Sequence, residues 1–319
     1  MSYALDTQLR QALAAMRPAE GEPPPRRPVR GDWEALRAGE SGLAALDAMK
    51  PAQPSVGRAD HHVASHDGAE ILLRWYTPAA HDPSAVGPAV VYLHGGGMVS
   101  GSVALFDRLV AGYAADSGVP FLSVDYRRAP EHPHPAPAED GFAGLTWLAG
   151  HAAELGVDPA RIALMGESAG GGLAAAATLL ARTRGLPVAR QILVYPMLDD
   201  RTTEPDPALL PFAMWSYDDN HTGWHALLGD AVGGPDVPGH AAPAREEDLS
   251  GLPPAYIEVG ELDIFRDEDV AYARRLAATG TSVELHVHPG CPHAFDHLAP
   301  GSDVARRARA DRLRVLAGL

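Results

Sequence analysis

The sequence predicts an α/β fold: a mostly parallel sheet with helices on both faces. Several apolar runs are too short and too continuous to be amphipathic helices, so they indicate buried strands. Helical stretches separate many of these runs, and a repeated strand–helix–strand order implies parallel strands joined by crossovers. With 319 residues, 46% of them hydrophobic, the chain can bury a core of this kind.

The first part of the chain, residues 1–50, is expected to be an appendage to the sheet. Two helical-looking pieces, 5–16 and 33–49, flank the segment GEPPPRRPVR at 21–30. Because proline removes a backbone donor and clashes with the preceding turn, this segment cannot continue a helix. A short irregular break is therefore predicted between two helices.

The sheet is expected to open with an antiparallel hairpin. The segment 61–78 holds two extended runs around Asp67 and Gly68, and this dipeptide supplies the positive φ of a tight turn. Buried strands are then predicted at AVVYLH (89–94), VPFLSVDY (119–126), RIALMG (161–166), QILVYP (191–196), AYIEVG (255–260) and VELHVHP (283–289). Helices are predicted at 139–155, 169–184, 268–278 and 302–319.

One segment departs from this alternation of strands and helices. Residues 199–248 are rich in Asp, Pro, His and Trp and carry no clear strand, so they are predicted to be a mainly helical insertion. Together with residues 1–50, the insertion is expected to form a cap above the carboxyl edge of the sheet, where ligands bind in such folds. The catalytic domain would then comprise residues 51–198 and 249–319.

Charge and composition exclude several classes of partner. A formal charge of -15 argues against nucleic acid and anionic membranes, because both require clustered Lys and Arg. The one cysteine, Cys291, excludes an intramolecular disulfide and any CxxC motif. No segment resembles a secretory signal or a run of about 20 apolar residues. We therefore expect a cytoplasmic protein with no membrane partner.

The motif GESAG places Ser168 between a predicted strand and a predicted helix. Flanking glycines permit a turn too sharp for side chains, and this context is typical of a nucleophile elbow. A serine that caps a helix is the simpler alternative. A dinucleotide loop at Gly170, Gly172 and Ala175 fits poorly, because it falls inside the helix and no acidic residue ends the next strand at Tyr195.

A serine nucleophile needs oxyanion donors and an acid that orients its base. The strand AVVYLH runs into HGGG at 94–97, where glycines let backbone N–H groups approach a substrate oxygen; a flexible loop is the alternative. For the acid, Asp263 lies just past a strand end. Glu261 could compete with it, whereas Asp267 and Glu268 are expected to be solvated charges in the first turn of a helix.

The base is sought among the 15 histidines. His286 and His288 alternate within a predicted strand, which favours packed or solvated side chains over metal ligands. Only His293 and His297 follow the last strand, and His293 lies nearer its end. His293 is therefore the predicted base.

Ser168, Asp263 and His293 each follow a different strand, in that order. This is the order of α/β-hydrolases, and it differs from the chymotrypsin and subtilisin orders. From about His61 to its end the chain resembles the bacterial hormone-sensitive lipase-like carboxylesterases. The resemblance rests on HGGG (94–97), DYRRAPEHPHPAPAED (125–140), GESAG (166–170), YPMLDDR (195–201), DIFRDE (263–268) and His293.

The resemblance implies the α/β-hydrolase fold, with an eight-stranded mostly parallel sheet and a helical cap built from the N-terminus and the insertion. It implies Ser168 as nucleophile, His293 as base and Asp263 as its orienting acid. The implied oxyanion donors are the backbones of three residues: Gly96, Gly97 and Ala169. Family members are often dimers, which makes a homodimer the protein partner to test for. Two positions depart from the family: Glu167, where Asp or Thr is usual, and Ala294, where Gly is usual.

The predicted activity is that of a serine carboxylesterase that cleaves small, short-chain acyl esters through an acyl-enzyme. An amidase or lactonase using the same triad, or a catalytically silent binding protein, is the alternative. No metal and no redox cofactor is implied. Arg127, Arg128 and Glu131 could form a clamp for a substrate carboxylate, but charges in such a proline-rich loop more often fix the loop itself.

Overall fold

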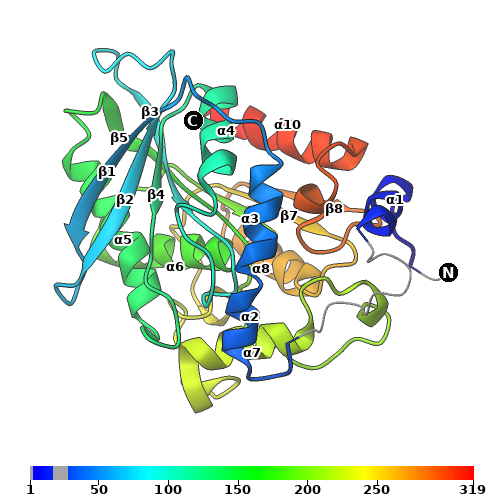
Figure 1. The fold of residues 1–319 in the computed structure, drawn as a ribbon. Helices are drawn as coiled ribbons and strands as arrows, with labels where there is room; N and C mark the ends of the chain where they lie inside the picture. Colours follow the sequence, from blue (N-terminus) through cyan, green and yellow to red (C-terminus); the bar gives the residue numbers. More distant parts are fainter. Residues whose placement is uncertain (1–2, 17–27) are drawn as a thin grey trace.

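The computed structural model describes residues 3–16 and 28–319, so most of the segment at 21–30 lies outside the described residues. An eight-stranded sheet has the order β1-β2-β4-β3-β5-β6-β7-β8 (Figure 1). Its strands are β1 (Gly57–Ala64), β2 (Glu70–Thr77), β3 (Gly87–Leu93), β4 (Phe121–Val124), β5 (Val157–Glu167), β6 (Arg190–Val194), β7 (Ala255–Gly260) and β8 (Val283–His288). Every predicted strand is present.

Strand direction agrees with the expected fold class. β1 and β2 form the antiparallel hairpin, and β2 also pairs antiparallel with β4. All other neighbours in the sheet are parallel. Gly68, in the hairpin turn, has a φ of 82°, which glycine adopts without a steric penalty. The prediction of a mostly parallel sheet is confirmed.

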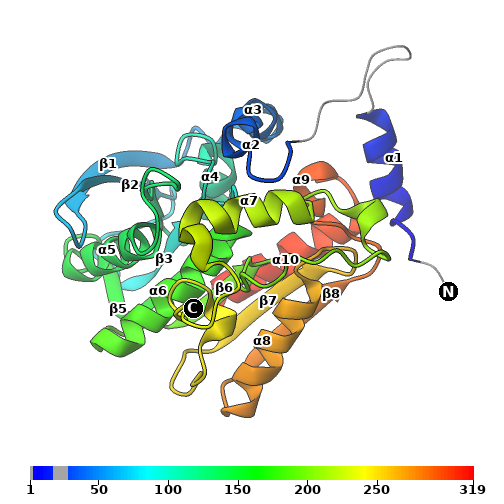
Figure 2. The same ribbon diagram turned by 90° about the horizontal axis from the view of Figure 1, so that it is seen from below.

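Helices cover both faces of the sheet, as Figure 2 shows. They are α4 (Asp107–Ser117), α5 (Ala136–Gly150), α6 (Ala169–Arg184), α8 (Arg266–Ala278), the short α9 (Phe295–Leu298) and α10 (Asp303–Ala317). α4 packs with α10 on one face, and α5 packs with α6 on the other. The predicted helix at 139–155 begins and ends earlier, at Ala136–Gly150, and the helix α4 was not predicted.

The N-terminal residues and the insertion supply the remaining helices. They are α1 (Thr7–Ala15), α2 (Trp33–Ala38), α3 (Glu40–Ala48) and α7 (Tyr217–Leu228). Residues 199–248 form no strand; besides α7 they contain three short 3-10 turns. α2 packs on α7, which crosses in front of the sheet in Figure 2. α1 lies apart from α2 and α3 and packs on α9. Just before α1, the Asp6 N–H donates to the Gly290 carbonyl (2.9 Å).

No helix in the described part of the chain is both long and apolar enough to cross a membrane.

Candidate active site

The turn between β5 and α6 presents Ser168 at the carboxyl edge of the sheet. Ser168 has a φ of 54° and a ψ of -123°, a backbone conformation that is rare for a residue with a side chain. A Cβ added at Gly166 would lie 2.1 Å from the Gly170 carbonyl oxygen, and one at Gly170 would lie 2.1 Å from the Leu93 carbonyl oxygen. Both glycines are therefore required for the turn that carries Ser168 at its tip.

The structure brings Ser168, His293 and Asp263 into one hydrogen-bonded chain. The Nε2 atom of His293 lies 3.0 Å from Ser168 Oγ, and its Nδ1 atom lies 2.7 Å from Asp263 Oδ2. The other oxygen of Asp263 accepts the backbone N–H of Phe265 at 3.0 Å. Asp263 is 1% exposed, and Ser168 and His293 are each 7% exposed. A low local dielectric therefore strengthens both hydrogen bonds.

The acidic neighbours of Asp263 have other partners. Glu261 accepts the backbone N–H of Gly290 at 2.9 Å. Asp267 pairs with Arg266 at 2.7 Å, and its side chain is 78% exposed, as expected for a first-turn charge. Neither carboxylate forms a hydrogen bond with the predicted base.

The prediction of a solvated role for Glu268 was wrong. Glu268 is 8% exposed, and its Oε1 accepts the backbone N–H groups of Leu198 (2.7 Å) and Asp199 (3.1 Å). The same carboxylate accepts the hydroxyl of Thr202. Its first-turn position faces the loop after β6, where the carboxylate satisfies two backbone N–H groups that no strand or helix pairs.

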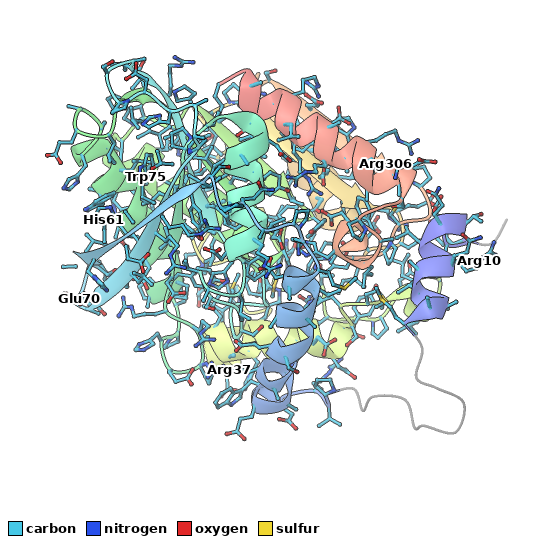
Figure 3. All side chains as sticks on the ribbon, turned by 45° about the horizontal axis from the view of Figure 1, so that its top comes forward. Arg10, Arg37, His61, Glu70, Trp75 and Arg306 are labelled. Carbon is cyan, nitrogen blue, oxygen red and sulfur yellow. The ribbon has the colours of Figure 1, made fainter. Side chains whose placement is uncertain are left out.

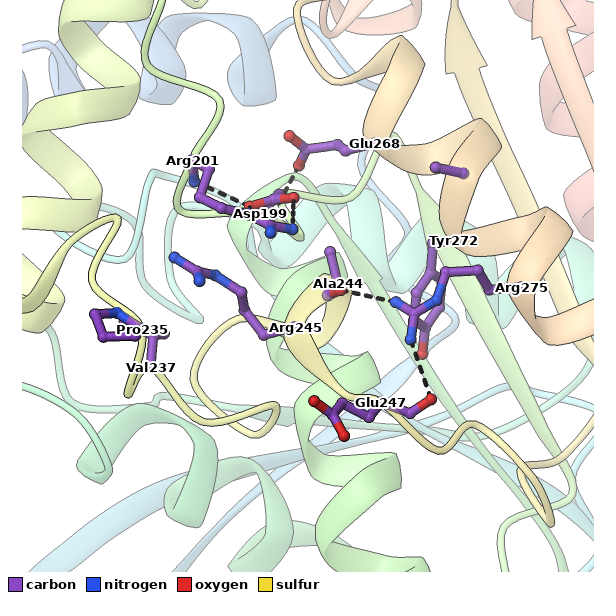
Figure 4. Close-up of a pocket in the computed structure, with 11 residues that line it drawn as sticks. Asp199, Arg201, Pro235, Val237, Ala244, Arg245, Glu247, Glu268, Tyr272 and Arg275 are labelled. Atoms are coloured by element: carbon purple, nitrogen blue, oxygen red, sulfur yellow. Dashed lines mark hydrogen bonds and ion pairs between the residues drawn. The ribbon is translucent and has the colours of Figure 1, made fainter.

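Glu268 also lines a pocket of about 470 Å³ between the insertion and α8 (Figure 4). Its arginines are already paired: Arg201 with Asp199, Arg245 with Asp200, and Arg275 with the carbonyl of Ala244. Ser168 does not line this pocket.

The glycine loop after β3 lies beside the serine. A Cβ added at Gly95 would lie 3.5 Å from Ser168 Cβ, and Gly96 and Gly97 have φ values of 120° and 61°. Within the described residues, no group accepts a hydrogen bond from the backbone N–H of Gly96, Gly97 or Ala169. These three donors are free to bind an oxygen of a ligand.

His94 holds this loop in shape. Burial lowers the pKa of His94 to about 4, so the ring is neutral at pH 7, and its Nδ1 lies 2.8 Å from the Gly95 carbonyl oxygen. Its own carbonyl accepts the hydroxyl of Tyr126 at 2.8 Å. A Cβ at Gly101 would lie 2.4 Å from the imidazole Nδ1. The loop is thus packed around the ring, which argues against the flexible-loop alternative.

Arg127, Arg128 and Glu131 form no free clamp. Their charges are paired within the protein: Arg127 with Asp140, Arg128 with Glu40, and Glu131 with Arg37. Figure 3 shows the position of Arg37 on α2. The prediction that these charges fix the loop is confirmed. The pairs to Glu40 and Arg37 also attach α2 and α3 to the loop that follows β4.

Trp215 lies at the site, although no sequence pattern pointed to it. A Cβ added at Gly97 would lie 2.3 Å from the edge of the Trp215 ring, and that ring is 6.5 Å from the His293 ring, centroid to centroid. The indole Nε1 lies 3.3 Å from the Asn220 side-chain oxygen. The only sequence signal for a role of Trp215 was that it is an aromatic residue in the predicted insertion.

Ala294 follows the predicted base and has a φ of 55°. This left-handed conformation favours glycine, the residue usual in the family at this position, because a Cβ there costs about 1–2 kcal/mol. The chain therefore holds an alanine in a backbone conformation that glycine would adopt at lower cost.

One group of potential metal ligands occurs among the described residues, namely Glu284, His286 and Asp311. Arg314 already pairs with both carboxylates of this group. The absence of a metal and of a cofactor from the reaction stays a prediction.

The comparisons with known proteins agree on one family. A family model described as alpha/beta hydrolase fold matches residues 90–297. The chain is 38% identical over 256 residues to the carboxylesterase NlhH of Mycobacterium tuberculosis, which is 76% of each chain. It is 34% identical over 254 residues to the ethyl acetate hydrolase of Pseudomonas putida, which is 79% of each chain.

Among solved structures, a bacterial heroin esterase superposes with a TM-score of 0.86 at 35% identity, covering 98% of this chain and 97% of that one. The chain therefore belongs to the α/β-hydrolase fold family. The resemblance to the bacterial hormone-sensitive lipase-like carboxylesterases is confirmed, and the chain is an ester hydrolase of that class.

Proposed function

We propose that this chain hydrolyses small, short-chain carboxylic esters, with Ser168 as nucleophile, His293 as general base and Asp263 as the acid that orients the base. The observation that carries the proposal is the unbroken hydrogen-bonded chain from Asp263 through His293 to Ser168. A hydroxyl is a weak nucleophile at neutral pH and requires a base within this distance.

The mechanism follows from the geometry. His293 Nε2 accepts the proton of Ser168 as its Oγ attacks the ester carbonyl. The carbonyl oxygen becomes an oxyanion, which the N–H groups of Gly96, Gly97 and Ala169 stabilise. The C–O bond to the alcohol then breaks, and the imidazolium returns its proton to the leaving oxygen. Water repeats the sequence on the acyl-enzyme and releases the carboxylic acid. Asp263 holds the Nδ1 proton of His293 and stabilises the imidazolium.

Residues 1–50 and 199–248 are proposed to form the cap over this site. The packing of α2 on α7 and the position of Trp215 beside Gly97 support the proposal. Because α1 packs on α9 instead, only the part of residues 1–50 that includes α2 and α3 would contribute directly. The relative named ethyl acetate hydrolase supports a short acyl group.

We expect Trp215→Ala to extend the acyl chain length that the enzyme accepts. The indole limits the space beside the oxyanion loop, and its removal opens volume for additional methylene groups, each contributing about 0.8 kcal/mol when buried. The measurement is kcat/KM for p-nitrophenyl esters from acetate to decanoate, with Trp147→Ala of α5 as a control far from the site. An unchanged optimum in Trp215→Ala would remove the indole from the acyl site.

Burst kinetics test the acyl-enzyme. With a p-nitrophenyl ester in excess we expect a rapid release of about one p-nitrophenol per active site, followed by slower steady turnover. A protein that only binds esters shows neither phase. Parallel rates on an ester and the matching anilide or lactone distinguish an esterase from an amidase or a lactonase.

The substrate is proposed to be the only partner that catalysis requires. The cytoplasmic location and the homodimer stay predictions; light scattering at micromolar protein concentration measures the second directly.

A further inference from the structure

The carboxylate next to the nucleophile takes part in a second buried pair. Glu167 immediately precedes Ser168, and its Oε1 lies 3.1 Å from Nε2 of His297. The side chain of Glu167 is 6% exposed and that of His297 is 9% exposed. Glu167 belongs to β5 and His297 to α9, so this pair joins two elements far apart in sequence.

Each end of the pair adjoins a residue assigned to catalysis. Glu167 shares a peptide bond with Ser168. His297 lies four positions after His293, and its backbone N–H donates to the carbonyl of Ala294 at 3.0 Å. One helical turn therefore connects His297 to the base, and a displacement of His297 would be transmitted to His293.

We propose that the Glu167–His297 ion pair is a positioning clamp, which ties the turn that carries Ser168 to the helical turn that follows His293 and so fixes the separation of nucleophile and base. This inference rests on the proposed function. Neither side chain touches the reacting atoms, so both are positioning residues. Effective proton transfer requires a heavy-atom distance of about 2.6–3.2 Å, and a misplacement of 1 Å can cost about 100-fold in rate.

The surroundings keep the pair charged. Burial raises the pKa of Glu167, but the His297 cation outweighs this effect and leaves the pKa below its ordinary value. Burial lowers the pKa of His297, but the carboxylates outweigh it and leave that pKa raised. The charged and titratable groups that face the pair come from four elements: Tyr92 from β3, Asp296 from α9, Lys50 from the segment after α3, and Arg312 from α10, which pairs with Asp296.

The pH dependence has a definite sign. Because the folded-state pKa of Glu167 is lowered and that of His297 is raised, the ion pair is complete between the two pKa values and is lost as the pH rises through that of His297. The clamp therefore predicts that kcat falls on the alkaline side, at the pH where His297 loses its proton. Lys50, whose Nζ lies 3.5 Å from Nδ1 of His297, opposes the positive charge on the imidazole and so lowers the pKa of His297.

The test compares Glu167→Gln, His297→Gln and the double variant with the wild type on a p-nitrophenyl ester. Both single variants are expected to lose about 10- to 100-fold in kcat. KM should change less than about twofold, since the pair does not contact substrate. The double variant should lose no more kcat than the less active of the two single variants, because the two residues act as one unit. Both single variants should also lack the alkaline decline of kcat. Glu167→Asp, which keeps the charge but shortens the reach, should be intermediate.

A Glu–His pair on the edge strand β8 serves as the control. His286 Nε2 and Glu284 Oε1 of β8 are 2.7 Å apart, at 30% and 32% side-chain exposure. Glu284→Gln and His286→Gln should leave kcat and its pH profile unchanged. Wild-type kcat in Glu167→Gln, or losses that multiply in the double variant, would overturn the clamp.

A readout without turnover separates the two proposals. The low-field ¹H resonance of the hydrogen bond between His293 and Asp263 should shift or broaden in Glu167→Gln and stay in place in Glu284→Gln. If the wild type fails to cleave any ester, the proposed function is wrong, and the resonance still decides the clamp. If it cleaves esters and the resonance is unchanged in Glu167→Gln, only the clamp is wrong.

Discussion

Ser168→Ala is expected to lower ester turnover by on the order of 10⁴-fold or more while the protein stays folded. In the proposed mechanism the acyl-enzyme forms on Ser168 Oγ, so removal of this atom leaves only the oxyanion donors and substrate binding. The fold should survive, because the glycines at 166 and 170 set the backbone of the turn. The measurements are kcat/KM on a p-nitrophenyl ester, thermal unfolding, and covalent labelling by an organophosphate.

Ser123→Ala is the matched control for this variant. Ser123 is a buried serine of β4 whose Oγ has no hydrogen-bond partner among the described residues. Its loss should leave both turnover and labelling intact. Near-normal rates in Ser168→Ala would place the nucleophile elsewhere and remove the basis of the proposed mechanism.

Asp263→Asn is expected to cost on the order of 10⁴ in kcat at nearly unchanged shape. Asp263 Oδ1 accepts the backbone N–H of Phe265, so an asparagine keeps its oxygen there and turns its amide NH₂ toward His293. The imidazole must then accept at Nδ1 and carry its proton on Nε2. In that tautomer it cannot take the proton of Ser168.

Asp267→Asn is the control for the acid. Asp267 is exposed and pairs only with the neighbouring Arg266 within the described residues, so turnover should hold and helix stability should fall by about a few tenths of a kcal/mol. A kinetic loss at Asp267 or Glu261, with Asp263→Asn nearly normal, would keep the serine mechanism but reassign its acid.

The elements of the fold could be predicted because their signals are local. The apolar runs and the dipeptide at Asp67 and Gly68 are properties of a few adjacent residues, and they identified strands and a hairpin that the structure contains. Helix boundaries were less accurate, as α5 shows: it begins at Ala136 and carries Pro137 in its first turn, where a helix tolerates proline because the missing N–H has no acceptor within the helix.

The site residues were predictable for a related reason. Parallel strands bring their carboxyl ends to one edge, so Ser168, Asp263 and His293 could be expected to meet once each was seen to follow a strand. Distance from the end of the preceding strand also favoured His293 over His297 as the base, and Asp263 over Asp267 as the acid. The structure places the three chosen side chains within hydrogen-bond distance.

Side chains whose role depends on a distant partner were not predictable. Glu268 has the sequence position of a solvated charge, yet it is buried against Leu198 and Asp199, about 70 positions away. Glu167 was visible only as a departure from the family, and its pair with His297 spans 130 positions. The hydrophobic periodicity of the segment around each glutamate does not indicate its distant partner.

The sequence by itself thus determined the fold class, the order of the strands along the chain, most of the helices, and the three side chains at the sheet edge. The hydrophobic period, the turn residues and the strand ends that predict them are all properties of neighbouring positions. Only the tertiary structure decided that α1 leaves α2 and α3 to pack on α9, that Trp215 covers Gly97, and that His297 binds Glu167. These contacts depend on which surfaces the folded elements leave opposite one another. Burial then decides which polar groups must find a partner, and no local pattern contains that information.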